Sequence, residues 1–358
     1  MDAHLARSLR PPHDGPMATG TLPEIDELLA LVGASGGQLS CRIACEVASG
    51  DRVFPVHVLT LGNPDRSLPA VGLFGGVHGL ERIGAEVVLA CLRSLVARLR
   101  WDRSLQLMLE GLHVVFMPLV NPGGLWRGTR ANPQGVDLMR NGPVECAEGA
   151  PPLLGGQRLS AGLPWYRGPA DAPMQTEAQA LCEVVETELL GREFALGIDC
   201  HSGFGLTDRL WFPHAHTRRP IEHLAEVQSL SRLLDDSLLH HRYLVEPQSR
   251  HYLAHGDLWD HLYLQSGARP GSLFLPLTLE MGSWLWVKKN PRQLFSRRGI
   301  FNPLIEHRQQ RVLRRHLWFL DFALRAAHGQ RHWRPPATQR GALRAEALAR
   351  WYAPRSER

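Results

Sequence analysis

Two histidines and a glutamate stand where strands end or a helix begins, and their types suit metal-assisted hydrolysis. His78 follows the apolar run "AVGLFGGV", and Glu81 comes three residues later at the start of a helical pattern. Both side chains can therefore project from the same side of a first helical turn. His201 ends a second apolar run, "FALGIDC". Two imidazoles and one carboxylate, with a fourth position left for water, form one of the standard catalytic zinc sites.

The segment "HGLE" also fits a purely structural role. A glutamate near a helix start complements the helix dipole, and a histidine after two glycines can be an ordinary turn residue. His-x-x-Glu is a short pattern, so both interpretations stay open for it alone, and His201 at another strand end favours the metal. Glu280 lies in the apolar run "LFLPLTLEMG". A charged side chain is unfavourable there unless it is paired, for example with an arginine, or functional.

The elements around these residues predict an α/β fold with a single central, mixed but mostly parallel β-sheet and helices on both faces. A strand over 70–77, a helix over 81–100 and a strand over 112–120 have the spacing of a right-handed crossover unit. Further strands are expected at 194–200 and 272–282, and a hairpin at 41–62 around the turn "SGDR". In such sheets, ligands gather where strands end and loops begin.

The chain divides into three parts by composition. Residues 1–22 are polar and rich in proline and predict a flexible segment, 23–327 predict the folded domain, and 328–358 form a tail rich in arginine and proline. Helices are expected at 23–37, 176–190, 221–241 and 303–327. The segment 121–173 is a loop too long for a compact domain unless it is functional. The tail is expected to be exposed, solvated and peripheral.

Bulk composition excludes several classes of protein. The 358 residues are 44% hydrophobic with a formal charge of +5, which describes a globular chain. Only Lys288 and Lys289 are lysines among 40 basic residues, a skew typical of genome composition rather than of a nucleic-acid-binding surface. The six cysteines form no Cys-x-x-Cys pair and are expected to be reduced. No signal peptide or membrane span is visible, so we expect a cytoplasmic protein that binds neither nucleic acid nor membranes. The oligomeric state is not indicated.

The chain resembles the zinc carboxypeptidase family, the carboxypeptidase A-like metallocarboxypeptidases. The resemblance rests on His78, Glu81 and His201 and on four sequence blocks that follow. The segment "NPGGLWRGTRANPQGVDLMRN" resembles the family's Asn-Pro-x-Gly, basic loop and Gly-Val-Asp-Leu-Asn-Arg-Asn stretch. The other blocks are "YRGPADAPMQTEAQAL", "HYLAHGDLWDHLY" and "LTLEMG", which occur in the family's order. The resemblance covers roughly residues 69–282 and implies a catalytic domain over 23–327.

The resemblance implies one Zn²⁺ per chain, held by His78, Glu81 and His201. Zinc in such a site polarises a carbonyl and lowers the pKa of bound water, as amide hydrolysis at neutral pH requires. Glu280 is implied as the general base that takes a proton from water and passes it to the leaving amine. Asp199, two residues before His201, is expected either to orient that histidine or to cap the strand end.

Three further side chains are implied for the substrate. Arg127 resembles the arginine that stabilises the oxyanion, and Arg130 is its nearby competitor. Arg140 resembles the arginine that binds a terminal carboxylate through its two-pronged guanidinium. Tyr252 resembles the mobile tyrosine that covers the bound substrate.

One position departs from the family pattern. Met139 stands where the family has an asparagine, and a thioether cannot donate a hydrogen bond to a carboxylate. The leading hypothesis is a zinc metallocarboxypeptidase-like hydrolase that cleaves an amide bond near a free carboxylate of a peptide. Met139 keeps a second one open, an N-acyl amino acid deacylase of the aspartoacylase and succinylglutamate desuccinylase type. A third, of another class, is a non-catalytic carboxylate-binding protein.

Overall fold

The computed structural model describes residues 21–269 and 271–353, so the flexible segment expected at 1–22 lies almost wholly outside the described residues. The strands are β1 (Ser40–Ser49), β2 (Arg52–Gly62), β3 (Ala70–Gly75), β4 (His113–Met117), β5 (Ala195–Ser202), β6 (Arg209–Phe212), β7 (Leu244–Pro247) and β8 (Phe274–Met281). The helices of the first half are α1 (Pro23–Ala34), α2 (Arg82–Arg98), α3 (Arg103–Glu110), α4 (Pro122–Arg127), η1 (Leu138–Arg140) and α5 (Thr176–Glu188). Those of the second half are α6 (Leu224–Ser237), η2 (Gln248–Arg250), α7 (Leu258–Gly267), α8 (Trp284–Lys289), η3 (Pro291–Phe295), α9 (Glu306–His328), α10 (Gln330–Trp333) and α11 (Ala337–Trp351). Within the described ranges, no helix combines the length and apolar character needed to cross a bilayer.

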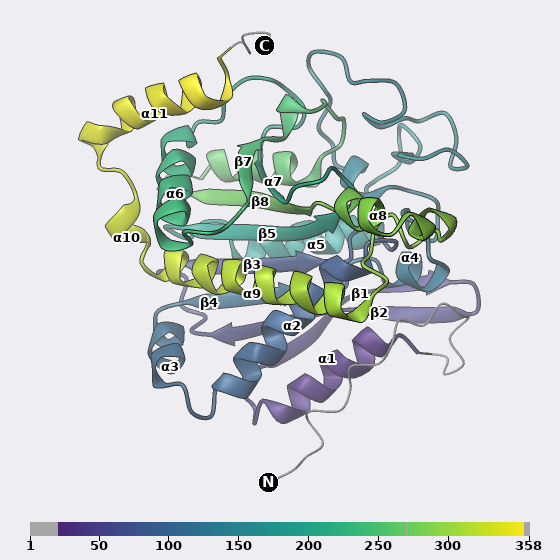
Figure 1. The fold of residues 1–358 in the computed structure, drawn as a ribbon, viewed down its shortest axis with the longest axis horizontal. Helices are drawn as coiled ribbons and strands as arrows, with labels where there is room; N and C mark the ends of the chain where they lie inside the picture. Colours follow the sequence, from purple (N-terminus) through teal and green to yellow (C-terminus); the bar gives the residue numbers. More distant parts are fainter. Residues whose placement is uncertain (1–20, 270, 354–358) are drawn as a thin grey trace.

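All eight strands join one mixed sheet in the order β1-β2-β4-β3-β5-β8-β6-β7 (Figure 1). The central strands β4, β3, β5 and β8 run parallel to one another, whereas β1 pairs with β2, β2 with β4, and β6 with β8 in antiparallel fashion. The expected α/β fold with a mostly parallel centre and helices on both faces is confirmed. The carboxyl ends of β3, β5 and β8 lie side by side, which is where such sheets place their sites.

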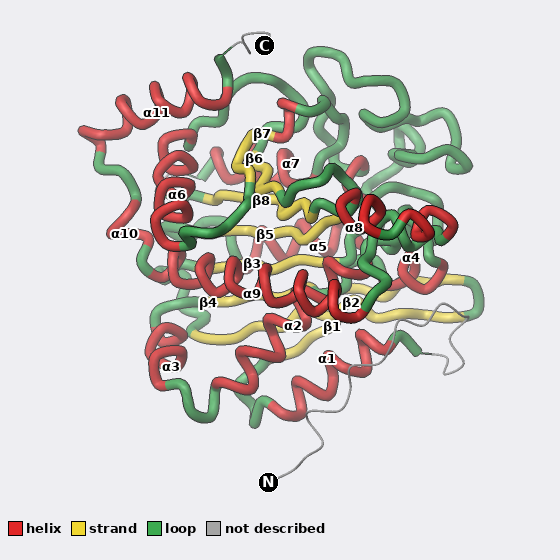
Figure 2. Tube along the Cα trace, in the orientation of Figure 1, coloured by secondary structure: helices red, strands yellow, loops and turns green. Residues whose placement is uncertain are grey.

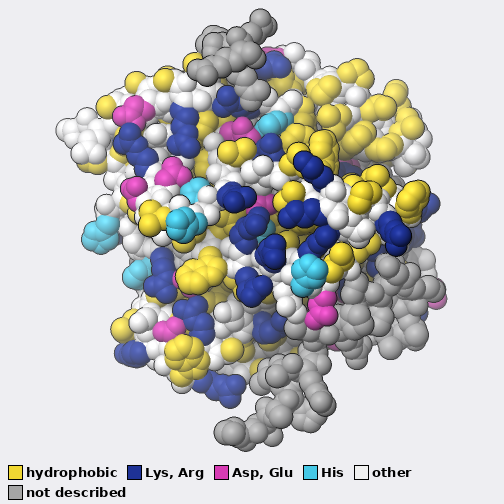
Figure 3. Space-filling view, in the orientation of Figure 1, with side chains coloured by type: hydrophobic (Ala, Val, Ile, Leu, Met, Phe, Trp, Pro, Cys, Tyr) yellow, Lys and Arg dark blue, Asp and Glu magenta, His cyan; other side chains and the backbone are white. Residues whose placement is uncertain are grey.

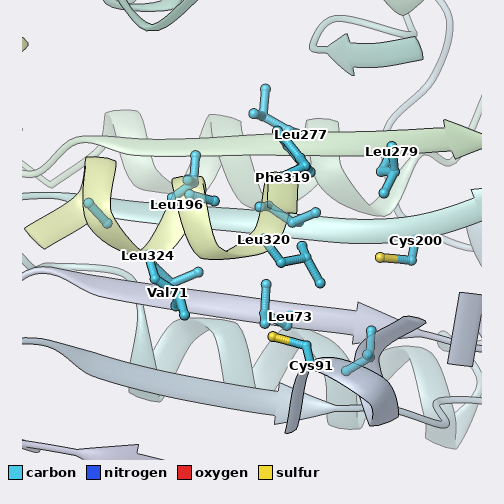
Figure 4. Packing of buried hydrophobic residues seen from close by; sticks show 14 of the residues in the cluster. Val71, Leu73, Cys91, Leu196, Cys200, Leu277, Leu279, Phe319, Leu320 and Leu324 are labelled. Carbon is cyan, nitrogen blue, oxygen red and sulfur yellow. The ribbon is translucent and has the colours of Figure 1, made fainter. Parts of the chain in front are cut away.

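Side chains alternate between the two faces of the central strands and build two separate cores. Val71 and Leu73 of β3 pack with α2 and α9 on one face, together with alternate residues of β5 and β8 (Figure 4). Ala70 and Phe74 pack on the other face with α5 and α7. The period of two therefore sends every second residue of β5 and β8 toward the α5 and α7 side, including His201 and Glu280. The sheet alternation thus orients two of the expected site residues in the same direction.

A long irregular segment borders the carboxyl ends of these strands. Residues 128–175 contain only the short η1 helix, and Figure 2 shows this region as loops beside the ends of β5 and β8. Because its backbone and side chains are packed against the pocket described below, the segment fits the functional loop that its length predicts.

The C-terminal segment differs from the exposed tail expected from its composition. Residues 337–351 form α11, which packs on α6 in Figure 1, and Trp351 is 4% exposed. Its indole donates a hydrogen bond to the Val245 carbonyl at 2.7 Å. Leu343, Ala347 and Trp351 are buried at a spacing of four residues, so they form one apolar helix face among the arginines. The expectation was wrong because composition conceals this periodicity.

The outer surface over α9 is basic. Figure 3 shows lysine and arginine side chains in a band across this face, and α9 contributes several exposed ones, Arg311, Arg314, Arg315 and Arg325. These charges lie on the opposite face of the sheet from His201 and Glu280.

Candidate metal centre and active site

His78, Glu81 and His201 meet at the carboxyl ends of β3 and β5. The His78 Nδ1 atom lies 2.9 Å from a Glu81 oxygen, and His201 Nδ1 lies 3.1 Å from the other Glu81 oxygen. The two Nδ1 atoms are 3.2 Å apart, and the three side chains are 2% to 4% exposed. Two ring nitrogens that face each other this closely need a shared cation or proton between them. The structure therefore brings all three expected ligands together.

A glycine allows this close approach. Glu81 is the residue that precedes α2, and Gly84 in the first turn of α2 lies against β5. A Cβ atom at Gly84 would lie 2.1 Å from the Cys200 carbonyl oxygen, so no larger residue fits. The Ser202 N–H donates to Glu81 at 2.9 Å. The helix start and the strand end are thus locked together, which sets the distance between Glu81 and His201.

Two buried aspartates orient the histidines. Asp137 contacts His78 Nε2 at 3.0 Å, and Asp199 contacts His201 Nε2 at 2.5 Å. The Trp259 indole fixes Asp199 with a hydrogen bond of 2.8 Å. A carboxylate on Nε2 holds the proton there and leaves the Nδ1 lone pair for a metal, which is the usual support of a metal-binding histidine. Asp199 therefore orients His201, and sequence reasoning assigned no role to Asp137 although it lies in the family-like block.

The electrostatics of the three ligands favour a cation. Burial opposes the charged form of His201, but the Asp199 and Glu81 carboxylates outweigh it and raise the pKa of that imidazole. Burial likewise acts to raise the pKa of Glu81, but the two histidines lower it overall. Both directions mean that positive charge is stabilised where the ligands meet. Two imidazole nitrogens, a carboxylate and supporting aspartates are a donor set that fits Zn²⁺.

Glu280 shares the pocket with these ligands. It is the register partner of His201 on the adjacent strand β8, and it is 6% exposed. One Glu280 oxygen accepts a hydrogen bond from the Phe204 N–H at 3.0 Å, which holds the carboxyl group in place. Burial and the nearby Glu81 charge raise the pKa of Glu280 to about 8, against the lowering influence of His201 and Arg130. A positioned carboxyl group with a raised pKa is what general-base catalysis requires, since it must accept and return a proton.

Arg130, rather than Arg127, reaches the site. The Arg130 guanidinium donates to Asp137 at 2.9 Å and to Glu81 at 3.1 Å, and both carboxylates raise the pKa of Arg130 despite its burial. Arg127 points away and donates to Ser49 Oγ at 2.9 Å and to the Pro133 carbonyl at 2.8 Å. The placement expected for Arg127 is therefore corrected. Helix α4 ends at Gly128, whose φ of 64° turns the chain, so only the arginine beyond the turn faces the pocket.

Arg140 and Tyr252 contribute to the wall of the same pocket. Arg140 is 2% exposed, and its guanidinium donates to the carbonyls of Met139 and Leu154 and, at 3.5 Å, to the Tyr252 hydroxyl. The Tyr252 ring lies 5.7 Å from the guanidinium carbon. A Cβ atom at Gly256 would lie 1.9 Å from the Arg140 carbonyl oxygen, so glycine is required for the two segments to meet. These hydrogen-bond partners are neutral oxygens, and the Arg140 charge also acts on the nearby Asp137 and Asp257 carboxyl groups, where it favours a lower pKa.

The pocket enclosed by these side chains has a volume of about 240 Å³. Its lining includes the three candidate metal ligands, Glu280 and Arg130, and Arg140 with Tyr252. Met139 also lines it, and its side chain is buried where the family pattern has an asparagine. The aromatic residues in the wall are Trp165, Phe204, Trp211, Tyr252 and Phe301.

Comparisons with known proteins agree with this geometry. The family model described as zinc carboxypeptidase matches residues 54–283. Carboxypeptidase SOL1 from Arabidopsis thaliana is 31% identical over 93 residues, which span 25% of this chain and 19% of that protein. The chain thus matches only a small part of this curated relative.

Solved structures show the same fold. A thrombin activatable fibrinolysis inhibitor has a TM-score of 0.61 at 18% identity, covering 84% of this chain and 72% of that one. Carboxypeptidase A from Helicoverpa armigera has a TM-score of 0.52 at 18% identity, covering 73% and 64%. The family model covers more than half of the sequence and includes His78, Glu81, His201 and Glu280. The chain belongs to the zinc carboxypeptidase family.

Proposed function

We propose that the protein is a zinc-dependent metallocarboxypeptidase that hydrolyses an amide bond near a free carboxylate of a peptide. The observation that carries the proposal is the set of groups that line one pocket. A metal-ligand set, a carboxyl group with a raised pKa and a buried arginine whose hydrogen-bond partners are neutral all line the same pocket. A substrate anchored by its carboxylate at Arg140 would extend its amide bond toward Glu280 and the metal ligands.

The residues of the chain divide the chemistry among them. Zinc held by His78, Glu81 and His201 would supply a Lewis acid for the carbonyl and a lowered pKa for water. Glu280 takes the proton of the attacking water and returns it to the leaving amine. Arg130 presents a fixed positive charge to the oxyanion that develops on the carbonyl oxygen.

Arg140 and Tyr252 bind the substrate. The Arg140 fork binds the terminal carboxylate through paired charge-assisted hydrogen bonds. The Tyr252 hydroxyl, which contacts Arg140 at 3.5 Å, stands next to the bound carboxylate and restricts its exchange with water. Recognition of the carboxylate places the amide bond at a fixed distance from Glu280, so orientation contributes to the rate.

Met139 favours a second candidate, an N-acyl amino acid deacylase of the aspartoacylase and succinylglutamate desuccinylase type. Its buried thioether replaces the amide that would complete carboxylate binding in the family pattern. A substrate with a second anionic group in its acyl part could compensate by another contact. This candidate shares the ligands and the base and differs only in which part of the substrate is recognised.

A parallel assay separates the two activities. The zinc-loaded protein is tested with N-blocked dipeptides, with the same dipeptides carrying a C-terminal amide, and with N-acyl amino acids. The carboxypeptidase proposal expects turnover of the first set and at least a 100-fold loss with the amides. Turnover confined to N-acyl amino acids would refute it in favour of deacylation. No turnover of any set by protein that holds a zinc ion which His78→Ala loses would support the non-catalytic carboxylate-binding alternative. The cytoplasmic location remains a prediction.

A further inference from the structure

A second cluster of metal-binding side chain types lies outside the catalytic pocket. His214 and His216 follow β6, and Asp260 lies in the first turn of α7. One ligand atom of each residue lies within 4.8 Å of the others. His214 is 7% and Asp260 1% exposed, whereas the His216 side chain is 14% exposed. The cluster thus has the composition of a metal site and one partly open side, through which an ion can enter.

The Asp260 carboxylate is held in a fixed orientation by the backbone. Its Oδ2 atom accepts hydrogen bonds of 2.8 Å from the N–H groups of both Ala215 and His216, and lies 2.5 Å from His216 Nδ1. The Oδ1 atom faces His214 Nδ1 at 4.0 Å. That separation is too long for a hydrogen bond. It exceeds the roughly 3.3 Å between two tetrahedral ligands with bonds of about 2.0 Å by under 1 Å, so a small inward shift of His214 would let both atoms bind one ion.

His214 is the observation that requires an explanation. Its Nδ1 atom is buried and has no hydrogen-bond partner among the described residues, although it points toward Asp260. A neutral imidazole nitrogen with a free lone pair is the form of histidine that binds metals. An unpartnered buried polar nitrogen is unfavourable because it has lost its hydrogen bonds to water without replacement. A cation between His214 and Asp260 removes that penalty.

We propose that His214 Nδ1, His216 Nδ1 and the Asp260 carboxylate bind a second divalent transition-metal ion, such as Zn²⁺. The ion replaces the proton shared between His216 Nδ1 and Asp260, and that proton is released to solvent. His216 Nδ1 and Asp260 Oδ2 then move apart by under 1 Å, from 2.5 Å to the separation of two tetrahedral ligands. Two imidazoles and a carboxylate select zinc and similar metals over Ca²⁺ and Mg²⁺, which prefer oxygen ligands.

The position of the cluster indicates what the ion does. The His214 and Ala215 carbonyls accept hydrogen bonds from the Ser249 N–H at 3.1 Å and the Ala254 N–H at 2.9 Å. The segment between these two contacts carries Tyr252. An ion that joins residues 214–216 to α7 therefore braces the backbone of the substrate-binding wall, without contributing to the catalytic metal site.

Zinc stoichiometry tests the inference separately from the catalytic proposal. Full-length protein is stripped with a chelator, reloaded with Zn²⁺, desalted and measured by elemental analysis. We expect two zinc ions per chain in the wild type, and one in each of His78→Ala and His216→Ala. His223→Gln serves as the matched control and should keep two, because His223 contacts Tyr263 beside the cluster but is no ligand.

The outcomes distinguish the two sites. An unchanged zinc content in folded His216→Ala, or a single zinc that His78→Ala loses, would overturn the second site. One zinc that His78→Ala keeps and His216→Ala loses would support the second site and refute the catalytic one. If His216→Ala does not fold, the melting temperature of His78→Ala decides: it should rise on addition of one equivalent of Zn²⁺, and no rise would contradict the inference.

Discussion

Replacement of Arg130 by methionine, with Arg127→Met as the matched control, tests whether Arg130 is the arginine that stabilises the oxyanion. The two arginines are three residues apart and lose the same charge, yet only Arg130 contacts the groups around the metal ligands. Arg127 is exposed and binds a serine hydroxyl and a backbone carbonyl. The pair therefore separates a local effect on the oxyanion from a general effect of removing positive charge.

The magnitude follows from the two roles of Arg130. Loss of one donor to a developing oxyanion lowers kcat by about 10²–10³-fold, or about 2.7–4 kcal/mol. The variant also leaves Asp137 and Glu81, which are 1% and 2% exposed, without their arginine. Both keep histidine partners, so we expect a further loss of about 1–3 kcal/mol in the free energy of unfolding. Arg127→Met should change kcat by less than about threefold and stability by less than about 1 kcal/mol.

The assay compares kcat and KM for a blocked dipeptide, with zinc content and urea unfolding measured on the same preparations. Arg130→Lys is included because a lysine keeps the charge but lacks the fork that reaches both carboxylates, so its kcat should lie between wild type and methionine. Near-normal kcat in zinc-loaded Arg130→Met, or a larger loss in Arg127→Met, would refute the assignment of Arg130.

Four further predictions follow from single contacts. Glu280→Gln should keep its zinc and lose about 10²–10⁴-fold in kcat, and a zinc-loaded variant with full activity would show that Glu280 is not the base. Met139→Asn should lower KM for C-terminal peptides by about tenfold with kcat unchanged, since it adds one hydrogen bond to a charged group; kinetics with the blocked dipeptide check this. Trp351→Ala should reduce the free energy of unfolding by about 3–5 kcal/mol in urea, which an exposed tail would not do. Burial lowers the pKa of His316 to about 4, whereas its value in the unfolded chain is about 6.5. As the pH falls from about 6.5 to about 4, the unfolded state therefore binds a proton that the folded state does not, and the free energy of unfolding decreases. Between pH 8 and pH 5 this histidine should reduce the free energy of unfolding by about 2 kcal/mol. Urea unfolding at the two pH values checks this, because the decrease in His316→Gln should be smaller than that of the wild type by about 2 kcal/mol.

The sequence predicts those parts of the site that depend on short-range order. His78 and Glu81 follow from one strand-to-helix junction, and His201 and Glu280 from the ends of two apolar strands. Strand alternation then requires His201 and Glu280 to face the same side of the sheet. These positions do not depend on the loop conformations, because the regular backbone geometry of each strand or helix fixes them.

The rest of the site depends on turns that composition does not reveal. The left-handed turn at Gly128 decides whether Arg127 or Arg130 enters the pocket, and "LWRGTR" places an arginine on each side of it. Asp137 acts through contacts with His78 and Arg130, which are 59 and 7 residues away in sequence. The composition does not reveal helix α11, because its buried residues are spaced among arginines and two prolines stand directly before it. The motifs can therefore be predicted from the sequence, whereas contacts between segments that are distant in sequence cannot.

The contrast between Arg140 and Met139 bears on the choice between peptide and N-acyl substrates. Arg140 is buried, and its guanidinium donates hydrogen bonds to carbonyl and hydroxyl oxygens, so no protein carboxylate occupies its hydrogen-bonding fork and a substrate carboxylate can bind there. Methionine at 139 removes one amide donor, a hydrogen bond to a charged group that is worth about 1.5–3 kcal/mol. The guanidinium fork, which supplies the charge and two donors, remains. Met139 should therefore weaken carboxylate binding by roughly ten- to a hundredfold without abolishing it. Such a loss raises KM but leaves the amide bond directed toward Glu280, so it is compatible with peptide hydrolysis at higher substrate concentration.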